Sequence, residues 1–206
     1  MVTQAQLLHR DTRGAVMIEG LLVFPVLLLA LAAVIEFGAL VYRANQWGKA
    51  LEIGARLASV SAPLLTDTAA LTADYPIAEG GPLPLATPSA ACGRGGPACD
   101  PVRLLRLVAG QDGLCAAETA GETPRGICDF ARNFPADQLR ITYTRTGQGI
   151  VQHSHLPALS IRLDIPPLQW PLPFLSKLLP QGSLAISIHP VTVMSEDLET
   201  CPNGCP

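Results

Sequence analysis

The fold of this chain is decided by residues 13–38, which read RGAVMIEGLLVFPVLLLALAAVIEFG. The 16 residues between Glu19 and Glu36 are uncharged and mostly aliphatic, and these two carboxylates are the only charges in the 28 residues from Ala15 to Tyr42. At about 1.5 Å per residue, 16 residues reach roughly 24 Å and 28 reach roughly 42 Å, whereas the hydrocarbon layer of a bilayer is about 30 Å thick. The segment therefore predicts one membrane-spanning helix.

Three positions distinguish this segment from a simple apolar anchor. Glu19 places a carboxylate near the span, which is costly without a partner, so Glu19 is either a functional position or a residue of the headgroup region. Gly14 ends a short polar leader and stands five positions before Glu19. Pro25 removes a backbone donor, and we therefore expect a kink or a local loosening of the helix there.

Gly14, four small or apolar residues and Glu19 together resemble the processing site of type IV prepilins. The stretch is most similar to the TadE-type pseudopilins of the tight adherence (Flp) pilus system. The resemblance is close over residues 10–62, and it is carried also by the apolar residues 22–28, by residues 35–38 and by residues 50–56. Gly20 departs from the family pattern, which usually has Phe or Tyr after the glutamate.

The resemblance implies that a prepilin peptidase cleaves between Gly14 and Ala15. It also implies that Glu19 pairs with the terminal amine of a neighbouring subunit during assembly, which is physically reasonable because opposite charges attract strongly in a low-dielectric medium. The implied partners are the peptidase, other pilins and pseudopilins, the inner-membrane assembly platform and the lipid bilayer. The implied role is that of a minor pseudopilin that initiates, caps or anchors a pilus.

A Sec signal peptide is the main alternative interpretation of the amino-terminal region. Residues 1–13 would be its charged region, residues 20–33 its apolar region and Ala30-Leu31-Ala32 its cleavage site. Against this interpretation, the apolar character continues through Val34, Phe37, Leu40 and Val41 without turn residues. The chain would then be an exported binding protein, and a third alternative is an anchored envelope protein that is never processed.

The charges give conflicting evidence on orientation. Arg10 and Arg13 precede the span, while Arg43, Lys49 and Arg56 follow it, so the count of basic residues slightly favours a cytoplasmic carboxyl-terminal domain. Six cysteines after the span indicate an oxidising compartment instead. We expect a single-pass protein of the bacterial inner membrane with a cytoplasmic amino terminus and a periplasmic domain. A net charge of −3 gives no reason to propose nucleic acid as a partner.

The six cysteines allow fifteen pairings, and the sequence does not choose among them. We favour pairing of nearest neighbours, because these close the smallest loops, with each bond contributing about 2–4 kcal/mol. The preferred pairs are Cys92 with Cys99, Cys115 with Cys128, and Cys201 with Cys205. No Cys-x-x-Cys motif is present, which argues against the competing reading of a zinc site.

The helix is expected to continue to about residue 62 and to present a face of small residues. Gly48 and Gly54 on this face permit close approach, either of the chain's own domain or of another subunit. Residues 63–135 are rich in Pro and Gly and predict loops, with a short helix near 66–73. Residues 101–109 predict a second helix, capped by Asp100 and ended by Gly110.

Alternating apolar and polar residues at 139–144, 161–165 and 184–189 predict strands of an antiparallel sheet. A turn at 147–149 would lead into residues 150–152, and residues 191–194 would prolong the last strand past Pro190. The apolar, proline-rich residues 166–175 have two uses: a cover over the sheet with Trp170 and Phe174 packed down, which we favour, or an exposed loop facing a partner or lipid.

No catalytic or phosphate-binding motif is present, so we expect no enzyme activity and no cofactor. His153 and His155 lack a third ligand and are expected to be solvated surface residues. The predicted fold is α+β and pilin-like, a long membrane helix followed by a loop-rich, disulfide-stapled antiparallel head. Its parts are a leader (1–14), the helix with its periplasmic extension (15–62) and a cysteine-containing domain (63–206) with loops at 63–135 and strands within 139–194.

Overall fold

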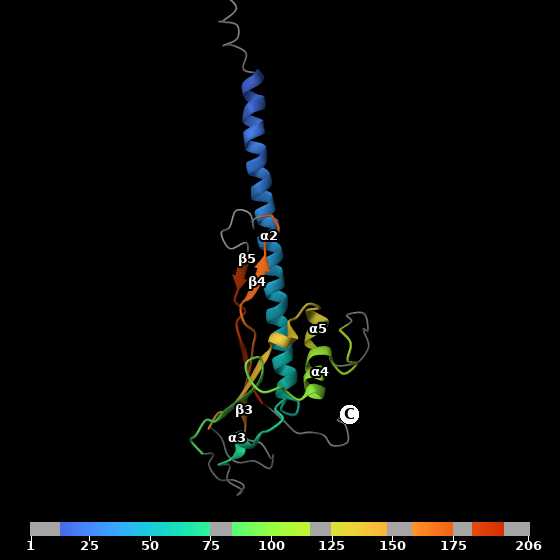
Figure 1. Ribbon diagram of the computed structural model, residues 1–206, viewed down its shortest axis with the longest axis vertical. Helices are drawn as coiled ribbons and strands as arrows, with labels where there is room; N and C mark the ends of the chain where they lie inside the picture. Colours follow the sequence, from blue (N-terminus) through green and yellow to red (C-terminus); the bar gives the residue numbers. More distant parts are fainter. Residues whose placement is uncertain (1–12, 75–83, 116–124, 148–157, 175–182, 196–206) are drawn as a thin grey trace, which may run out of the picture. The chain divides into compact units, whose positions relative to one another are not determined.

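The computed structural model describes residues 13–74, 84–115, 125–147, 158–174 and 183–195 (Figure 1). The chain divides into two compact units, which we call the helix unit (Met1–Arg43 with Gln169–Ala185) and the head unit (Ala44–Leu168 with Ile186–Pro206). The predictions made for the 147–152 turn, His153, His155, Cys201 and Cys205 lie wholly or largely outside the described residues.

One helix, α2 (Arg13–Ser59), supplies the first part of the helix unit and the first part of the head unit. The long helix predicted from the apolar stretch is therefore confirmed, and it ends close to the predicted residue 62. It continues without interruption through Pro25. The bend predicted at Pro25 remains a prediction.

The head unit contains an antiparallel sheet of order β1-β2-β3-β6, formed by β1 (Ser89–Gly93), β2 (Arg140–Arg145), β3 (Leu159–Asp164) and β6 (Val191–Met194). Every second residue of β2 and β3 is buried, which is the two-residue alternation that the sequence shows. The α+β class and the strands predicted near 139–144 and 161–165 are confirmed.

The last predicted strand was wrong in its pairing and its length. β5 (Ser183–Ile186) pairs with β4 (Leu168–Pro171) in a separate two-stranded sheet, and residues 187–190 form no strand. After Pro190 the chain starts a new strand, β6, beside β3. Because proline cannot donate to a strand ladder, it separates β5 and β6 instead of lying within one strand.

Strand β1 and its pairing with β2 were not expected, because residues 63–135 were predicted to be loops. Its sequence, Ser-Ala-Ala-Cys-Gly, lacks the large β-branched and aromatic residues typical of strands. Its pairing with β2 runs from Ser89–Thr144 to Gly93–Arg140. Gly93, with φ of 92°, ends the strand in a conformation that favours glycine.

The last part of α2 packs within the head unit through the predicted small-residue face. Ala50, Leu51, Ala55 and Ala58 are fully buried. A Cβ added at Gly54 would lie 2.5 Å from Ile127 Cδ1 and 3.2 Å from Leu163 Cδ2, so glycine is needed there, whereas nothing lies within 4 Å of such an atom at Gly48. Of the two uses expected for this face, Gly54 serves the chain's own domain.

Four short helices complete the described part of the head unit: α3 (Ala69–Thr72), α4 (Pro101–Ala109), α5 (Ile127–Phe130) and the 3-10 helix η1 (Ala136–Gln138). The Asp100 side chain accepts hydrogen bonds from the N–H groups of Val102 and Arg103, both at 3.0 Å, and Gly110 ends α4 with φ of 78°. The predicted cap and stop of α4 are thus confirmed.

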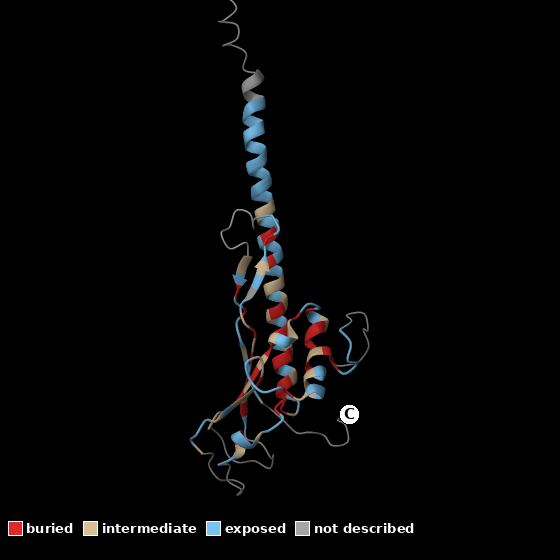
Figure 2. Cartoon of the chain, viewed as in Figure 1, coloured by how far each residue is buried: buried red, intermediate tan, exposed pale blue. Residues whose placement is uncertain are grey.

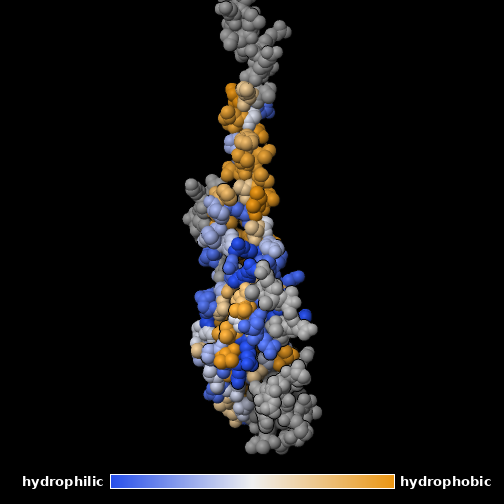
Figure 3. All heavy atoms as spheres, turned by 90° about the vertical axis from the view of Figure 1, so that its right-hand side faces the viewer, coloured by the Kyte–Doolittle hydropathy of each residue, from blue (hydrophilic) through white to orange (hydrophobic). Residues whose placement is uncertain are grey.

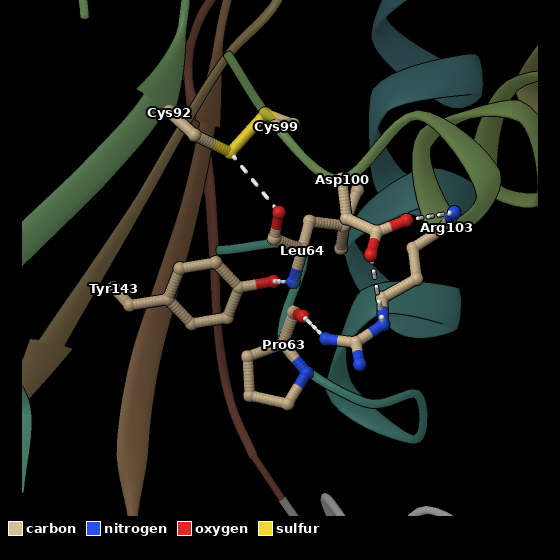
Figure 4. The surroundings of a disulfide bond; sticks show 7 residues. All are labelled: Pro63, Leu64, Cys92, Cys99, Asp100, Arg103 and Tyr143. Carbon is tan, nitrogen blue, oxygen red and sulfur yellow. Dashed lines mark hydrogen bonds and ion pairs between the residues drawn. A yellow bond between two sulfur atoms is a disulfide. The ribbon is translucent and has the colours of Figure 1, made fainter. Parts of the chain in front are cut away.

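Leu64, just after α2, is the point where several elements of the head unit meet (Figure 4). Its N–H donates to the buried Tyr143 hydroxyl of β2 at 3.0 Å, and its carbonyl accepts from Asp100 N–H at 2.8 Å. Cys92 Sγ, bonded to Cys99, lies 3.7 Å from the same carbonyl. Arg103 donates to the carbonyl of Pro63. The chain just after α2 is therefore held by hydrogen bonds to β2 and to the start of α4, and it lies beside a disulfide.

A second buried polar group, Arg145 at the end of β2, holds the loop segments beside it. Its guanidinium donates to both carboxylate oxygens of Asp74, at 2.6 and 2.9 Å, to Leu71 O at 3.0 Å and to Ala86 O at 2.9 Å. The side chain of Arg145 is fully buried. The hydrogen bond from Arg145 lowers the pKa of Asp74. The planar guanidinium fork satisfies all these acceptors together, which a lysine could not do.

We predict that Gly126→Ala destabilises the head unit. A Cβ at this position would lie under 3.0 Å from three backbone atoms at the end of α4, namely Gly110 N, Val108 O and Ala109 C. Backbone atoms cannot move aside as a side-chain end can, so we expect a loss of about 1–3 kcal/mol in the free energy of unfolding. Denaturant unfolding of the full-length protein in detergent measures it.

Gly96→Ala is the matched control for this substitution. Gly96 also lies outside the left-handed region, and the nearest atom to an added Cβ is Ala91 O at 3.5 Å. We expect a change within about 0.5 kcal/mol. Equal stability of both variants would contradict the close approach of α4 and α5 at Gly126.

We also predict that Tyr143→Phe destabilises the head unit by about 1–3 kcal/mol, because the buried N–H of Leu64 loses its acceptor. Burial raises the pKa of Tyr143 from 10.0 to about 12. Since the folded-state pKa is the higher one, the contribution of the neutral phenol is complete below the unfolded pKa and is lost as the pH rises through about 12. Denaturant unfolding at neutral and alkaline pH measures both effects.

The exposed Tyr42 provides the control, since Tyr42→Phe removes an equal hydroxyl from the surface of α2. We expect Tyr42→Phe to be as stable as the parent at neutral pH, and Tyr143→Phe to lose less stability than the parent as the pH rises through about 12. A Tyr143→Phe variant as stable as the parent at neutral pH would show that the Leu64 hydrogen bond contributes nothing.

Candidate functional site

The candidate site is the apolar part of α2 in the helix unit, where large hydrophobic side chains are exposed around the whole helix (Figures 2 and 3). Met17 is 80% exposed, Leu21 74% and Val34 70%. The other exposed members are Ile18, Leu22, Val23, Phe24, Val26, Leu27, Leu28, Leu29, Leu31, Ile35, Phe37 and Val41. A surface of this kind is unfavourable in water and is typical of a helix surrounded by lipid or by other helices.

Among the described residues, α2 is the one helix that is long and apolar enough to cross a membrane. The 18-residue window that meets this test is not buried at all within the chain. The same length and composition also occur in a signal sequence, so they establish the capacity to span. One such helix near the amino terminus suggests a single-pass membrane anchor.

The predicted processing position lies in the first turn of α2, which begins at Arg13. The peptide bond between Gly14 and Ala15 is therefore helical. A peptidase needs an extended backbone, so cleavage requires this first turn to unwind, which is inexpensive at a helix terminus. The structure leaves the cleavage itself a prediction.

Glu19 lies within the apolar surface and is exposed. Its neighbours Ile18 and Leu21 are 66% and 74% exposed, and a Cβ added at Gly20 would meet nothing within 4 Å. The carboxylate is thus accessible from outside the chain, in a setting that becomes apolar once the helix enters a bilayer. An intramembrane carboxylate of this kind favours a cationic partner.

Glu36 differs from Glu19, because it is only 6% exposed. Its side chain accepts a hydrogen bond from the N–H of Phe174, which follows β4 in the same unit. Seven residues along the helix, Arg43 Cζ lies 4.3 Å from the centre of the Trp170 ring, a cation–π contact. The sequence marked Glu36 as the end of the apolar run and as part of the family resemblance at 35–38, and it gave no signal for these contacts.

These contacts correct the prediction for the proline-rich segment. Phe174 was expected to pack down over the sheet, but it is 65% exposed. Trp170 is partly buried and contacts Arg43, while Leu172 is fully buried. The first part of the segment forms β4, which pairs with β5 in a separate two-stranded sheet.

The structure contains two of the three preferred disulfides, Cys92–Cys99 and Cys115–Cys128. The first links Cys92 in β1 to Cys99 in the loop that follows, and the second links residue 115 to α5. In the part of the chain that the structure describes, no three His, Cys, Asp or Glu side chains form a group able to hold a metal ion.

We predict that Glu36→Ala loosens the β4 segment from α2. Leaving the N–H of Phe174 without its acceptor costs about 1–3 kcal/mol, so exchange of the amides of Gln169, Trp170, Leu172 and Phe174 should become roughly five- to one-hundred-fold faster. Hydrogen-exchange mass spectrometry of the full chain in detergent measures this. Glu52→Ala, at an exposed position of the same helix, is the control and should leave these amides unchanged. Unchanged exchange in both variants would contradict the Glu36–Phe174 contact.

Comparison with known proteins gives a family match for part of the chain. No curated protein and no solved structure matches the chain. The sequence profile of the family described as TadE-like protein matches residues 14–56. The matched residues begin at Gly14, include Glu19 and Glu36, and end within the buried part of α2. The resemblance expected from the residues is therefore confirmed: residues 14–56 are similar to the TadE-like family.

Proposed function

We propose that the protein is a minor pseudopilin that takes part in assembly of a Flp (tight adherence) pilus at the bacterial inner membrane. The main support for this proposal is that the residues that match the TadE-like family include the exposed apolar surface of α2. The matched residues include Gly14, Ala15 and Glu19, the positions proposed for processing and pairing, and the apolar span proposed as the anchor. The protein acts by assembly, and catalysis has no part in its role.

In this proposal, a prepilin peptidase cleaves after Gly14, and Ala15 becomes the amino terminus. Glu19 is then the fifth residue of the mature chain. Its exposure supports pairing with the terminal amine of a neighbouring pilin or pseudopilin. In the low dielectric of the bilayer each charge alone is costly, so pairing selects one register between helices.

We place the amino terminus in the cytoplasm and the head unit in the periplasm. Two disulfides in the head unit support this orientation, because such bonds persist in oxidising compartments. The expected partners are the peptidase, other pilins and pseudopilins, the assembly platform of the inner membrane and the bilayer.

The exposed apolar surface also favours retention of the helix over Sec cleavage near residue 32. Val34, Ile35, Phe37 and Val41, all beyond that site, are between 46% and 70% exposed. A mature chain starting near Ala33 would carry these side chains into water.

The first test is the amino-terminal sequence and unreduced mass of the protein recovered from its native membrane. We expect a chain that begins at Ala15 and lacks two hydrogens for each disulfide. A chain that begins near Ala33 would replace this proposal with an exported binding protein. A chain that begins at Met1 would indicate an unprocessed anchored envelope protein.

The second test is Glu19→Gln. Because an unpaired amine in the bilayer costs about 2.5–3.5 kcal/mol, we expect pilus assembly to fall by roughly one hundred-fold while the protein remains in the membrane. Glu52→Gln changes an exposed carboxylate of the same helix outside the apolar span and should assemble normally. Normal assembly by Glu19→Gln would exclude the pairing role.

A further inference from the structure

We propose that the segment Trp170–Phe174 is a second membrane contact, with Phe174 inserted at the boundary between lipid headgroups and acyl chains. This inference rests on the membrane anchoring proposed for α2. It concerns the helix unit alone, where α2 and the segment are in contact.

Two contacts determine how the segment runs along α2. Trp170 contacts Arg43, and Phe174 is bonded to Glu36. Seven helical residues cover about 10 Å, and four extended residues cover about 13 Å, so the segment follows the helix axis toward the amino terminus. Figure 1 shows β4 alongside α2.

The direction of the Glu36 side chain places Phe174 still nearer the apolar surface. Helical side chains lean toward the amino terminus of their helix, so the Glu36 carboxylate lies over the preceding turn. The N–H that it accepts from belongs to Phe174. Phe174 therefore lies level with the last turns of the apolar span, where Ile35 and Phe37 are 60% and 46% exposed.

The chemistry of the segment suits the membrane interface. Phe174 is 65% exposed, and Pro171 and Pro173 are exposed beside it. Proline has no N–H to desolvate, and the N–H of Phe174 already donates to Glu36, so little unpaired backbone would enter the apolar layer. Trp170 and Arg43 lie on the water side, as aromatic and basic residues do at membrane boundaries.

The occupant of this surface is lipid because the surface continues the exposed apolar side chains of α2 at the same level. The test compares tryptophan introduced at three exposed positions of the full-length protein in phospholipid vesicles. Phe174→Trp reports on the segment, Leu27→Trp on the middle of the span and Leu105→Trp on α4 of the head unit. Emission is measured relative to the parent, which contains Trp47 and Trp170.

Quenching by lipids brominated at shallow or deep acyl positions and by aqueous iodide distinguishes the outcomes. At position 174 we expect strong quenching by the shallow bromolipid and little quenching by iodide. The shallow bromolipid should quench position 174 roughly half as strongly as the deep bromolipid quenches position 27, or more. At position 105 we expect quenching by iodide alone. Phe174→Trp is a conservative change of an exposed side chain. It leaves the buried Leu172 in place and keeps the hydrogen bond from the backbone N–H of residue 174 to Glu36.

Two results would overturn the inference while leaving the anchor intact. Bromolipid quenching at position 27 with iodide quenching at 174 would place the segment in water. Protection of position 174 from both quenchers would show a protein partner instead of lipid. Absence of bromolipid quenching at position 27 would refute the membrane anchoring itself, and with it this inference.

Discussion

The structure depends on one continuous helix, α2, whose two parts are suited to different surroundings. Residues 17–35 of α2 expose large hydrophobic side chains on every side, whereas residues 50–58 bury mostly small ones, Ala50, Gly54, Ala55 and Ala58, within the head unit. Large side chains suit a lipid environment, because they need no particular partner. Small ones allow the close backbone approach that a packed domain needs, as the space at Gly54 shows.

The head unit compensates for few regular elements by fixing irregular backbone with polar anchors. Leu64 is held by Tyr143 and Asp100, and the segments around Asp74 and Ala86 are held by Arg145. The two anchoring side chains, Tyr143 and Arg145, are alternate buried residues of β2. The Cys92–Cys99 disulfide reinforces the region around Leu64, and Cys115–Cys128 links residue 115 to α5. A proline-rich chain thus obtains a defined structure from a small sheet.

The sequence predicted the features that arise from local chemistry. The capping of α4 by Asp100 and Gly110 needs only neighbouring residues, and β2 and β3 follow from their two-residue alternation. The apolar helix and the motif of Gly14 and Glu19 were likewise visible without a structure. Nearest-neighbour pairing of cysteines was correct for the two described pairs.

Features that depend on distant partners could not be predicted in this way. Strand β1 has weak intrinsic preference and forms because β2 offers an edge, and β5 and β6 separate because they pair with different strands. The fully buried Arg145 resembles any surface arginine in the sequence. Phe174 was expected to be buried because it is apolar, but its place beside Glu36 depends on a contact 138 positions apart.

The packing at Gly54 has a consequence for the order of synthesis. Gly54 meets Leu163 of β3, 109 positions later in the chain, and β6 closes the sheet only at residues 191–194. The buried face of α2 therefore leaves the ribosome long before the strands that cover it. During that interval this face of α2 remains uncovered, while the apolar part of the same helix is already suited to lipid. Non-local contacts of this kind form slowly, so the interval between translation of the helix and closure of the sheet is when this chain is most open to aggregation and to chaperones.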